Sequence, residues 1–362
     1  MVAEITIFGP NFGESILVDN GNNHWMLIDS CLDPETHEPV ALKYLKEKGL
    51  DPAAAIKLIV ISHWHDDHVK GMADIIKQCK NAKIVMPGAL LDEEFIEFAV
   101  SFLSATPITG GNGTREITSV LEYLAESGRE PEMALDNKVI ERFPAEDINS
   151  SSDTVIHTLS PSNEQYIQFL TAISENHRQI GEAGKKAIRQ KPNHVAIAIW
   201  VESNDLNILL GSDLEETGNP KLGWSAILNS SARPRGKADV YKVSHHGSEN
   251  GDHDEIWTKL LSDAPLCVLT PFVNGAVRLP RKKDVERLVT KTNDIFITSN
   301  NLKPKKVKRT GKVQQMIKAT AKGGKLKRVD HLYGQITCKR QDGKWEITLA
   351  NESVHLKELL QK

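Results

Sequence analysis

Six consecutive residues, His63-Trp64-His65-Asp66-Asp67-His68, constrain this chain more than any other stretch. An apolar run over residues 56–61 precedes them and predicts a buried strand, and the pattern from Val69 to Ile76 predicts a helix. The polar side chains are therefore expected in a strand-to-helix loop, where α/β sheets usually place their chemistry. The whole chain of 362 residues has 13 histidines, so this density indicates a built site rather than chance.

The spacing within the motif predicts two neighbouring cation sites. Side chains two positions apart on an extended backbone project to the same side, so His63 and His65 can hold one cation together. The chain then turns, which offsets Asp67 and His68 toward a second cation. Imidazole and carboxylate ligands without thiolate are typical of a hydrolytic zinc, manganese or iron site and not of a closed structural zinc site. We do not expect Asp66 to be a ligand.

His-x-His-x-Asp-His after an apolar strand resembles the motif of the metallo-β-lactamase superfamily. The resemblance covers residues 1–300 and implies an αββα sandwich with one or two metals at one edge of its sheets. The opening pattern, FGESILVDNG followed by WMLIDS, resembles in particular the DNA-uptake competence-protein branch. Asp29 then matches a supporting aspartate, which implies that it orders the metal loop without binding metal. A strand-ending aspartate outside the site is the alternative.

Two further strand ends match elements of the superfamily. The first ends at Asp213, which the resemblance implies to bridge both metals, because each carboxylate oxygen is an acceptor; a helix N-cap is the alternative. The second, KVSHHGS, resembles the Lys-x-x-His-His-Gly-Ser element of the DNA-uptake branch. This implies His246 as a ligand of the second metal and His245 as a proton donor or phosphate contact, although the sequence leaves their order open. Lys242 either points into the site or only edges the strand.

The chain departs from the superfamily at the third histidine of the first metal. A Gly-His-Thr element usually supplies it, whereas this chain has Lys191-Pro192-Asn193-His194 at that place. His194 is offset from the usual position, and we keep it as a candidate ligand. If it does not bind, the first metal is held by fewer protein ligands.

Composition divides the chain into a domain over 1–300 and a region over 301–362. Residues 91–149 predict a helical insertion in the domain. The segment 303–328 carries nine lysines, two arginines and no acidic residue, so it is either a solvated linker or a contact for nucleic-acid phosphates through counterion release. The residues after it predict a hairpin that turns at Asp342-Gly343 and a short helix, which together suggest a small C-terminal appendage.

The ends and the composition favour a cytoplasmic protein. A hydrophobic content of 40% and a charged content of 26% are ordinary for a soluble globular domain. The four cysteines form no CxxC pair, which predicts reduced thiols. The N-terminus MVAEITIFGP has no basic leader, and no run reaches the ~18 apolar residues of a membrane span, so we expect no membrane partner.

These features predict a metal-dependent hydrolase with two divalent cations, zinc or manganese. Such a pair lowers the pKa of bound water and clamps phosphodiester oxygens, so a phosphodiesterase or nuclease acting on nucleic acid or a nucleotide is the main hypothesis. A hydrolase of small esters, thioesters or lactones is the alternative, and a non-catalytic binding module is a third, because fold alone does not give function. The expected catalytic residues are Asp67, His245 and Lys242, and the expected metal ligands are His63, His65, Asp67, His68, Asp213, His246 and His194.

Overall fold

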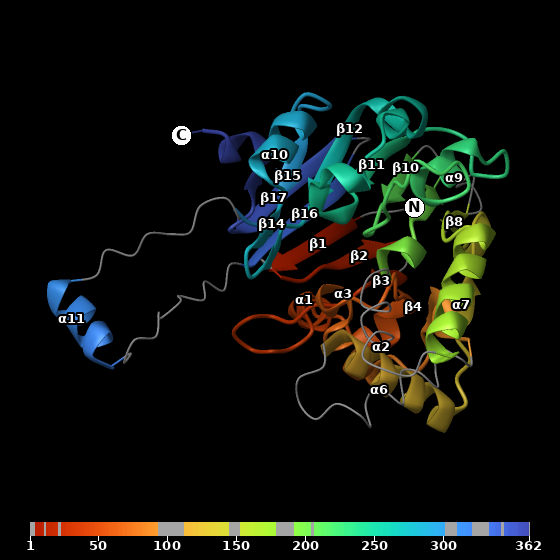
Figure 1. Ribbon diagram of the computed structural model, residues 1–362, viewed down its shortest axis with the longest axis horizontal. Helices are drawn as coiled ribbons and strands as arrows, with labels where there is room; N and C mark the ends of the chain where they lie inside the picture. Colours follow the sequence, from red (N-terminus) through yellow and green to blue (C-terminus); the bar gives the residue numbers. More distant parts are fainter. Residues whose placement is uncertain are drawn as a thin grey trace.

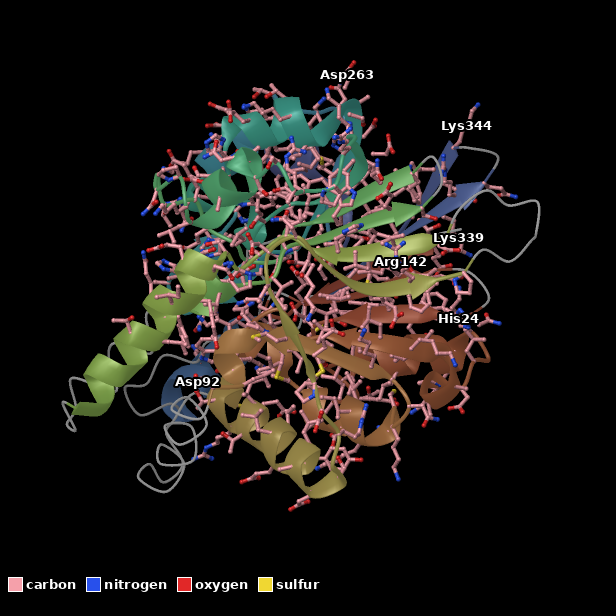
Figure 2. The ribbon with its side chains drawn as sticks, turned by 90° about the vertical axis from the view of Figure 1, so that its right-hand side faces the viewer. His24, Asp92, Arg142, Asp263, Lys339 and Lys344 are labelled. Atoms are coloured by element: carbon pink, nitrogen blue, oxygen red, sulfur yellow. The ribbon has the colours of Figure 1, made fainter. Side chains whose placement is uncertain are left out.

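The structure is a computed structural model that describes residues 4–10, 12–20, 23–92, 112–144, 153–178, 192–203, 206–300, 310–320, 333–341 and 344–361. Two eight-stranded sheets face each other, and helices cover the outer face of each sheet (Figure 1). The side view shows the strands in the middle, with helical layers above and below them (Figure 2). The expected αββα sandwich is confirmed.

The first sheet has the strand order β17-β16-β1-β2-β3-β4-β5-β6. Its strands are β1 Glu4–Pro10, β2 Ser15–Asp19, β3 Trp25–Ile28, β4 Ile56–Val60, β5 Lys83–Pro87, β6 Glu132–Ala134, β16 Tyr333–Gln341 and β17 Lys344–Asn351. Strands β3 to β6 run parallel to one another. Their carboxyl ends therefore lie at one edge of the sheet.

The second sheet has the order β18-β15-β12-β11-β10-β9-β8-β7. Its strands are β7 Lys138–Phe143, β8 Thr154–Thr158, β9 Ile199–Ser203, β10 Leu206–Leu210, β11 Ala238–Lys242, β12 Leu261–Leu269, β15 Ile295–Ile297 and β18 Val354–His355. Strands β10, β11, β12 and β15 are parallel, so the residues that follow them share an edge. A separate hairpin of β13 Phe272–Asn274 and β14 Val277–Leu279 follows β12.

Alternating side chains on the strands build the core. On β1, Ile5 and Ile7 point between the sheets and pack with residues of the facing sheet such as Ile208 and Val240, whereas Phe8 points to the outer helices. This period of two places apolar side chains on both faces of a central sheet. Most of the favourable free energy of folding in such a sandwich comes from this buried apolar surface.

Helices shield the outer faces. The first sheet is covered by α1 Val40–Glu47, α2 Pro52–Ala55, α3 Asp66–Val69, α4 Met72–Gln78 and α6 Asn112–Ser127, with α7 Asn163–Arg178 beside them. The second sheet is covered by α9 Gly223–Asn229, α10 Lys282–Leu288 and the short 3-10 helix Leu356–Leu359. Helix α11 Gly311–Thr320 lies apart from the sandwich (Figure 1). Among the described residues, no helix combines the length and the apolar character that crossing a bilayer requires.

The C-terminal hairpin belongs to the sandwich. Strand β16 pairs with the whole length of β1, from Glu4 with Lys339 to Pro10 with Tyr333. Its side chains Ile336 and Cys338 are fully buried in the core between the sheets. The separate C-terminal appendage expected from the composition is therefore wrong, because the hairpin supplies two strands that the first sheet needs to cover its core.

The expected helical insertion at 91–149 is helical only in part. Helix α6 lies within it, and the helix expected over 91–105 lies outside the described residues except for its first two positions. The insertion also provides β6 and β7, which extend one edge of each sheet. It is thus built into both layers.

Candidate functional site

The histidine-rich motif follows β4 and leads into α3, as the apolar run before it predicted. The rings of His63 and His65 lie together, with His63 Nε2 3.1 Å from His65 Nδ1. His63 and His68 are fully buried, and Asp67 is 3% exposed. The two-residue spacing therefore does bring the first pair of histidines together.

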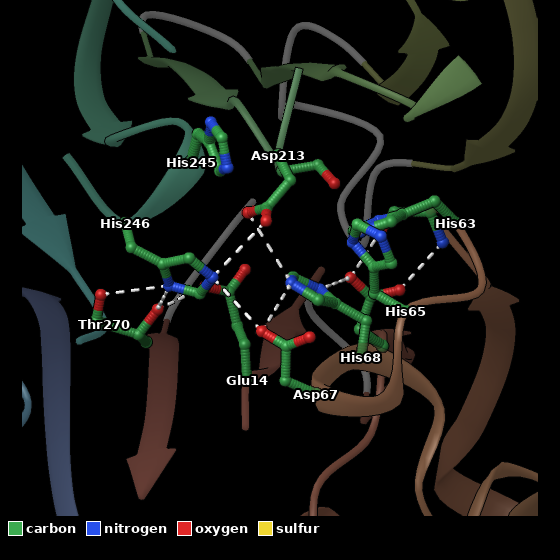
Figure 3. A network of polar contacts seen from close by, with 12 residues as sticks. Glu14, His63, His65, Asp67, His68, Asp213, His245, His246 and Thr270 are labelled. Carbon is green, nitrogen blue, oxygen red and sulfur yellow. Dashed lines mark hydrogen bonds and ion pairs between the residues drawn. The ribbon is translucent and has the colours of Figure 1, made fainter. Parts of the chain in front are cut away.

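The ends of β3, β10 and β11 meet this loop at the same edge of the sandwich, and they carry Asp29, Asp213 and His246. Figure 3 shows Asp213 and His246 beside the residues of the loop. Four buried side-chain atoms converge there: Asp67 Oδ2, His68 Nε2, Asp213 Oδ1 and His246 Nε2. His246 Nε2 lies 3.2 Å from Asp67 Oδ2 and 3.3 Å from Asp213 Oδ2, and His68 Nε2 lies 3.5 Å from Asp213 Oδ1. In the described part of the chain none of the four converging atoms has a hydrogen-bond partner. Buried polar atoms are rarely left so, and this donor set fits a divalent cation.

A second group lies beside the first. Ligand atoms of His63, His65 and Asp213 are all within 4.8 Å of one another. Asp213 is a member of both groups, as expected for a carboxylate between two cations. The two groups together form a His/Asp cluster that is able to hold divalent metal.

Hydrogen bonds on the far side of the rings fix which nitrogen faces the cluster. Asp29 accepts from the backbone N–H of Ser62 at 2.7 Å, from Ser62 Oγ at 2.6 Å and from His68 Nδ1 at 2.7 Å. Because the Ser62 hydroxyl donates to Asp29, its oxygen accepts from His63 Nδ1 at 2.9 Å. His63 and His68 therefore carry their protons at Nδ1 and present Nε2 to the cluster. The sequence analysis did not identify Ser62 as a residue of the site. Its position between the apolar strand and the histidine-rich motif is the sequence feature that could have indicated this role.

The electrostatics favour positive charge at the centre of the cluster. Burial lowers the pKa of His63 well below its ordinary value, and the neighbouring His68 and His65 lower it further, so this ring stays neutral. Burial would also lower the pKa of His246, but the facing carboxylates of Asp213 and Asp67 raise it to about 9. The same carboxylates that hold a proton on His246 would attract a metal cation, whose binding would displace that proton.

His245 and His194 lie outside both groups. The Nε2 atom of His245 accepts from Asn193 Nδ2 at 3.1 Å, and its Nδ1 lies 3.4 Å from Glu215 Oε1. His194 is 33% exposed, and its Nε2 lies 3.9 Å from Glu215 Oε2. Of the histidine pair, His246 is thus the member within the cluster, and His194 does not reach it. Sequence reasoning missed Asn193 and Glu215, which stand next to residues that it considered.

Lys242 does not face the cluster. Its side chain is fully buried, with Nζ 2.7 Å from Glu14 Oε1 and 3.1 Å from the carbonyl oxygen of Ser212, to which it donates. The geometry therefore contradicts its expected place among the catalytic residues, because a lysine so enclosed cannot reach a substrate. Glu14 was not singled out from the sequence, although an acidic residue directly before the apolar run SILV is a weak signal.

Aromatic side chains border the cluster on one side. The ring of Phe272 lies 5.3 Å from the ring of His246 and 5.4 Å from that of Phe12. The ammonium group of Lys70 lies 4.6 Å from the centre of the Phe12 ring. We refer to Phe12, Phe272 and Lys70 as the aromatic rim. All three are partly exposed.

Comparisons with known proteins agree with the motif. Over 264 residues, 73% of this chain and 26% of the relative, the chain is 22% identical to "ComE operon protein 3" of Bacillus subtilis (strain 168), so it spans about a quarter of that relative's length. Over 87 residues, 24% of this chain and 30% of the relative, it is 32% identical to "Hydroxyacylglutathione hydrolase" of Aliivibrio salmonicida (strain LFI1238). A similar solved structure is "Rm3 metallo-beta-lactamase", with a TM-score of 0.32, 15% identity, and coverage of 65% of this chain and 76% of that one.

A family model described as "Metallo-beta-lactamase superfamily" matches residues 8–103. This range contains Asp29 and the whole of the histidine-rich motif, which are the residues that build one side of the cluster. Residues 8–103 are therefore similar to the metallo-beta-lactamase superfamily, whose members are in general metal-dependent hydrolases.

Proposed function

We propose that the chain hydrolyses phosphodiester bonds, in a nucleic acid or a nucleotide, with two divalent cations of zinc or manganese at the cluster. The observation that carries this proposal is the convergence of four buried, unpartnered ligand atoms, with Asp213 shared between two groups. His63, His65 and Asp213 would hold the first cation. Asp67, His68, Asp213 and His246 would hold the second.

The residues of the chain prepare the site for hydrolysis. Two cations bound there would lower the pKa of water and stabilise the negative charge of the reacting phosphoryl group. Asp67 and Asp213 balance that positive charge, and the buried histidines keep bulk water from the ligand atoms. His245 lies at the border of the cluster, with Glu215 Oε1 3.4 Å from its Nδ1. Its proposed role is to donate a proton to the leaving oxygen.

The surroundings of the cluster support a phosphodiester of a nucleotide or nucleic acid. The aromatic rim offers ring faces on which a base can stack, and Lys70 adds a positive charge for a phosphate. The segment 303–328 carries nine lysines, two arginines and no acidic residue. Such clustered positive charge would favour a polyanionic substrate.

A thioester hydrolase is the second candidate. It is favoured by the local similarity to a protein named hydroxyacylglutathione hydrolase, which covers 24% of this chain. A match of 87 residues is too short to include both His63 and His246, so the phosphodiester proposal accounts for more of the chain.

A substrate panel separates the two candidates. The purified chain, supplied with Zn²⁺ or Mn²⁺, is tested on bis-p-nitrophenyl phosphate, single- and double-stranded DNA, RNA, cyclic nucleotides and a glutathione thioester. We expect hydrolysis of phosphodiesters, and a loss of at least about 10³-fold in Asp67→Ala because a ligand of the second cation is removed. The matched control is Asp66→Ala, since the Asp66 carboxylate accepts from the backbone of Gly113 and lies outside the cluster. Hydrolysis of the thioester alone would refute the phosphodiester proposal.

A further inference from the structure

A buried ion pair between the two sheets lies directly behind the cluster. Glu14, just before β2, and Lys242, at the end of β11, are 1% and 0% exposed in their side chains, and Lys242 Nζ lies 2.7 Å from Glu14 Oε1. Burying two charges is costly unless both are paired and hydrogen-bonded further. The further contacts of this pair all lead to residues of the cluster.

The first contact runs through Lys242 to the strand end that carries Asp213. The ammonium donates to the carbonyl oxygen of Ser212 at 3.1 Å. Ser212 has a φ of 46°, in the left-handed region that non-glycine residues rarely adopt. The charged hydrogen bond therefore holds the strained turn that aims the Asp213 carboxylate at the cluster.

The second contact runs through Thr270 to His246 (Figure 3). Thr270 Oγ1 donates its one proton to Glu14 Oε2 at 2.5 Å, so the same oxygen accepts from His246 Nδ1 at 3.1 Å. The carbonyl oxygen of Thr270 is a second acceptor, 3.2 Å from Nδ1. This chain of donors fixes the proton of His246 at Nδ1 and turns Nε2 toward Asp67 and Asp213.

The third contact comes from the backbone. The N–H of Glu14 donates to the carbonyl oxygen of Asp67 at 2.8 Å. One residue thus touches the supports of Asp67, Asp213 and His246, while none of these contacts reaches His63 or His65. His63 is instead held by the Asp29–Ser62 bonds, and Asp29 also accepts from His68 Nδ1.

We propose that Glu14 is the positioning residue of the second cation site, and that Lys242 and Thr270 transmit its effect. The inference rests on the metal-binding part of the proposed function and not on the substrate. It assigns the supports of the cluster to two buried carboxylates: Asp29 holds the rings of His63 and His68, and Glu14 supports Asp67, Asp213 and His246.

Titration of the full chain with Zn²⁺ tests this assignment. Wild-type protein, stripped with a chelator and titrated in a calorimeter, is expected to bind two equivalents. Glu14→Gln keeps the size of the side chain but loses its charge. We expect roughly 10- to 100-fold weaker binding of one equivalent and a smaller loss at the other, because Asp213 belongs to both groups. The matched control is Glu4→Gln, because Glu4 is also buried and ion-paired, with Lys48 at 2.9 Å, but lies away from the cluster.

A milder pair of variants covers the case in which Glu14→Gln fails to fold. Thr270→Val removes only the hydroxyl contact and leaves the ion pair intact, so it should weaken the same equivalent, whereas Thr270→Ser should restore it. Two full-affinity equivalents in Glu14→Gln or Thr270→Val, equal weakening in Glu4→Gln, or a single equivalent in the wild type would each overturn the proposal. If the second equivalent is lost as expected while no phosphodiester is cleaved, the positioning role stands and only the proposed function falls.

Discussion

Truncation after residue 300 should unfold this protein. A boundary at that point is what the composition suggests, but the cut would strip β16 and β17 from β1 and β18 from β15. It would leave β1, a central strand of the first sheet, as an edge. It would also open the core between the sheets and the layer over the second sheet.

The magnitude follows from three side chains alone. Ile336 and Leu356 are 0% exposed and Leu359 is 4% exposed, and all three are lost in the truncation. Fully burying one aliphatic side chain contributes about 1.5–3 kcal/mol, so the three contribute roughly 5–9 kcal/mol. A whole domain is stable by only about 5–15 kcal/mol, so this loss alone is comparable with the total.

The assay is thermal and urea unfolding, followed by circular dichroism, of the chain 1–300 beside a variant that lacks only the basic segment. In that second variant about eight Gly and Ser residues replace 303–328. The linker can close the gap because Gly334 lies against the carbonyl of Thr298. Helix α11, which the excision removes, exposes 46% of Val313 and 73% of Met316, so its loss costs little buried surface.

We expect the truncated chain to be insoluble or unfolded and the excised chain to melt within about 2 °C of the wild type. A soluble 1–300 chain with a cooperative transition at the wild-type temperature would refute the reasoning, because the C-terminal strands would then be an addition to a complete fold. The excised chain also tests whether the basic segment contacts nucleic acid. If the segment contacts phosphates, the excision lowers the rate of nucleic-acid cleavage and leaves the rate of bis-p-nitrophenyl phosphate hydrolysis unchanged.

Three further predictions concern metal, pH and the rim. Zn²⁺ at about 100 times its dissociation constant should stabilise the fold by about 2.7 kcal/mol, so chelation should lower the melting temperature by about 4 °C; Asp213→Ala should show no such shift. Burial raises the pKa of Asp33, but Lys43 and two backbone N–H groups outweigh it and lower the pKa to about 2. The ionised Asp33 carboxylate therefore stabilises the fold fully above its ordinary pKa of 3.8, and this stabilisation is lost as the pH falls toward 2. Asp33→Asn should lower the free energy of unfolding, measured in urea, by about 1–2 kcal/mol at pH 7 and by little at pH 2.5. If bases stack on the rim, Phe12→Ala should raise KM for single-stranded DNA about 10-fold and leave bis-p-nitrophenyl phosphate unchanged; equal effects on both would exclude stacking.

Sequence reasoning succeeded where the relation between residues is local or repeated. His63 and His65 lie together because the period of an extended strand puts alternate side chains on one side. Asp213 and His246 join them because parallel strands present their carboxyl ends at one edge, so strand ends that carry polar residues meet.

Sequence reasoning failed where the direction of a side chain, or a contact between residues far apart in the sequence, decides whether a residue reaches the cluster or a strand joins a sheet. The offset of His194 from the usual position leaves its ring beside Glu215. The side chain of Lys242 follows the charge of Glu14, which is 228 positions earlier in the sequence and cannot be matched to it from pattern alone. The pairing of β16 with β1 likewise joins the two ends of the chain, and a change in composition between them hides it.

Backbone conformation at the cluster explains why both supporting carboxylates are needed. Asp29, Ser212, His245 and His246 have φ values of 57°, 46°, 48° and 51°, so every strand end that serves the cluster from β3, β10 or β11 passes through the left-handed region. Such residues cost about 1–3 kcal/mol each when they are not glycine, and the surrounding structure must hold them. The bonds of Asp29 to Ser62 and of Lys242 to Ser212 do so at two of these turns. A glycine would relieve the strain, but the cluster needs the side chains of Asp29 and His246, so glycine cannot replace them. The backbone strain therefore remains, and the hydrogen bonds of the buried carboxylates offset it.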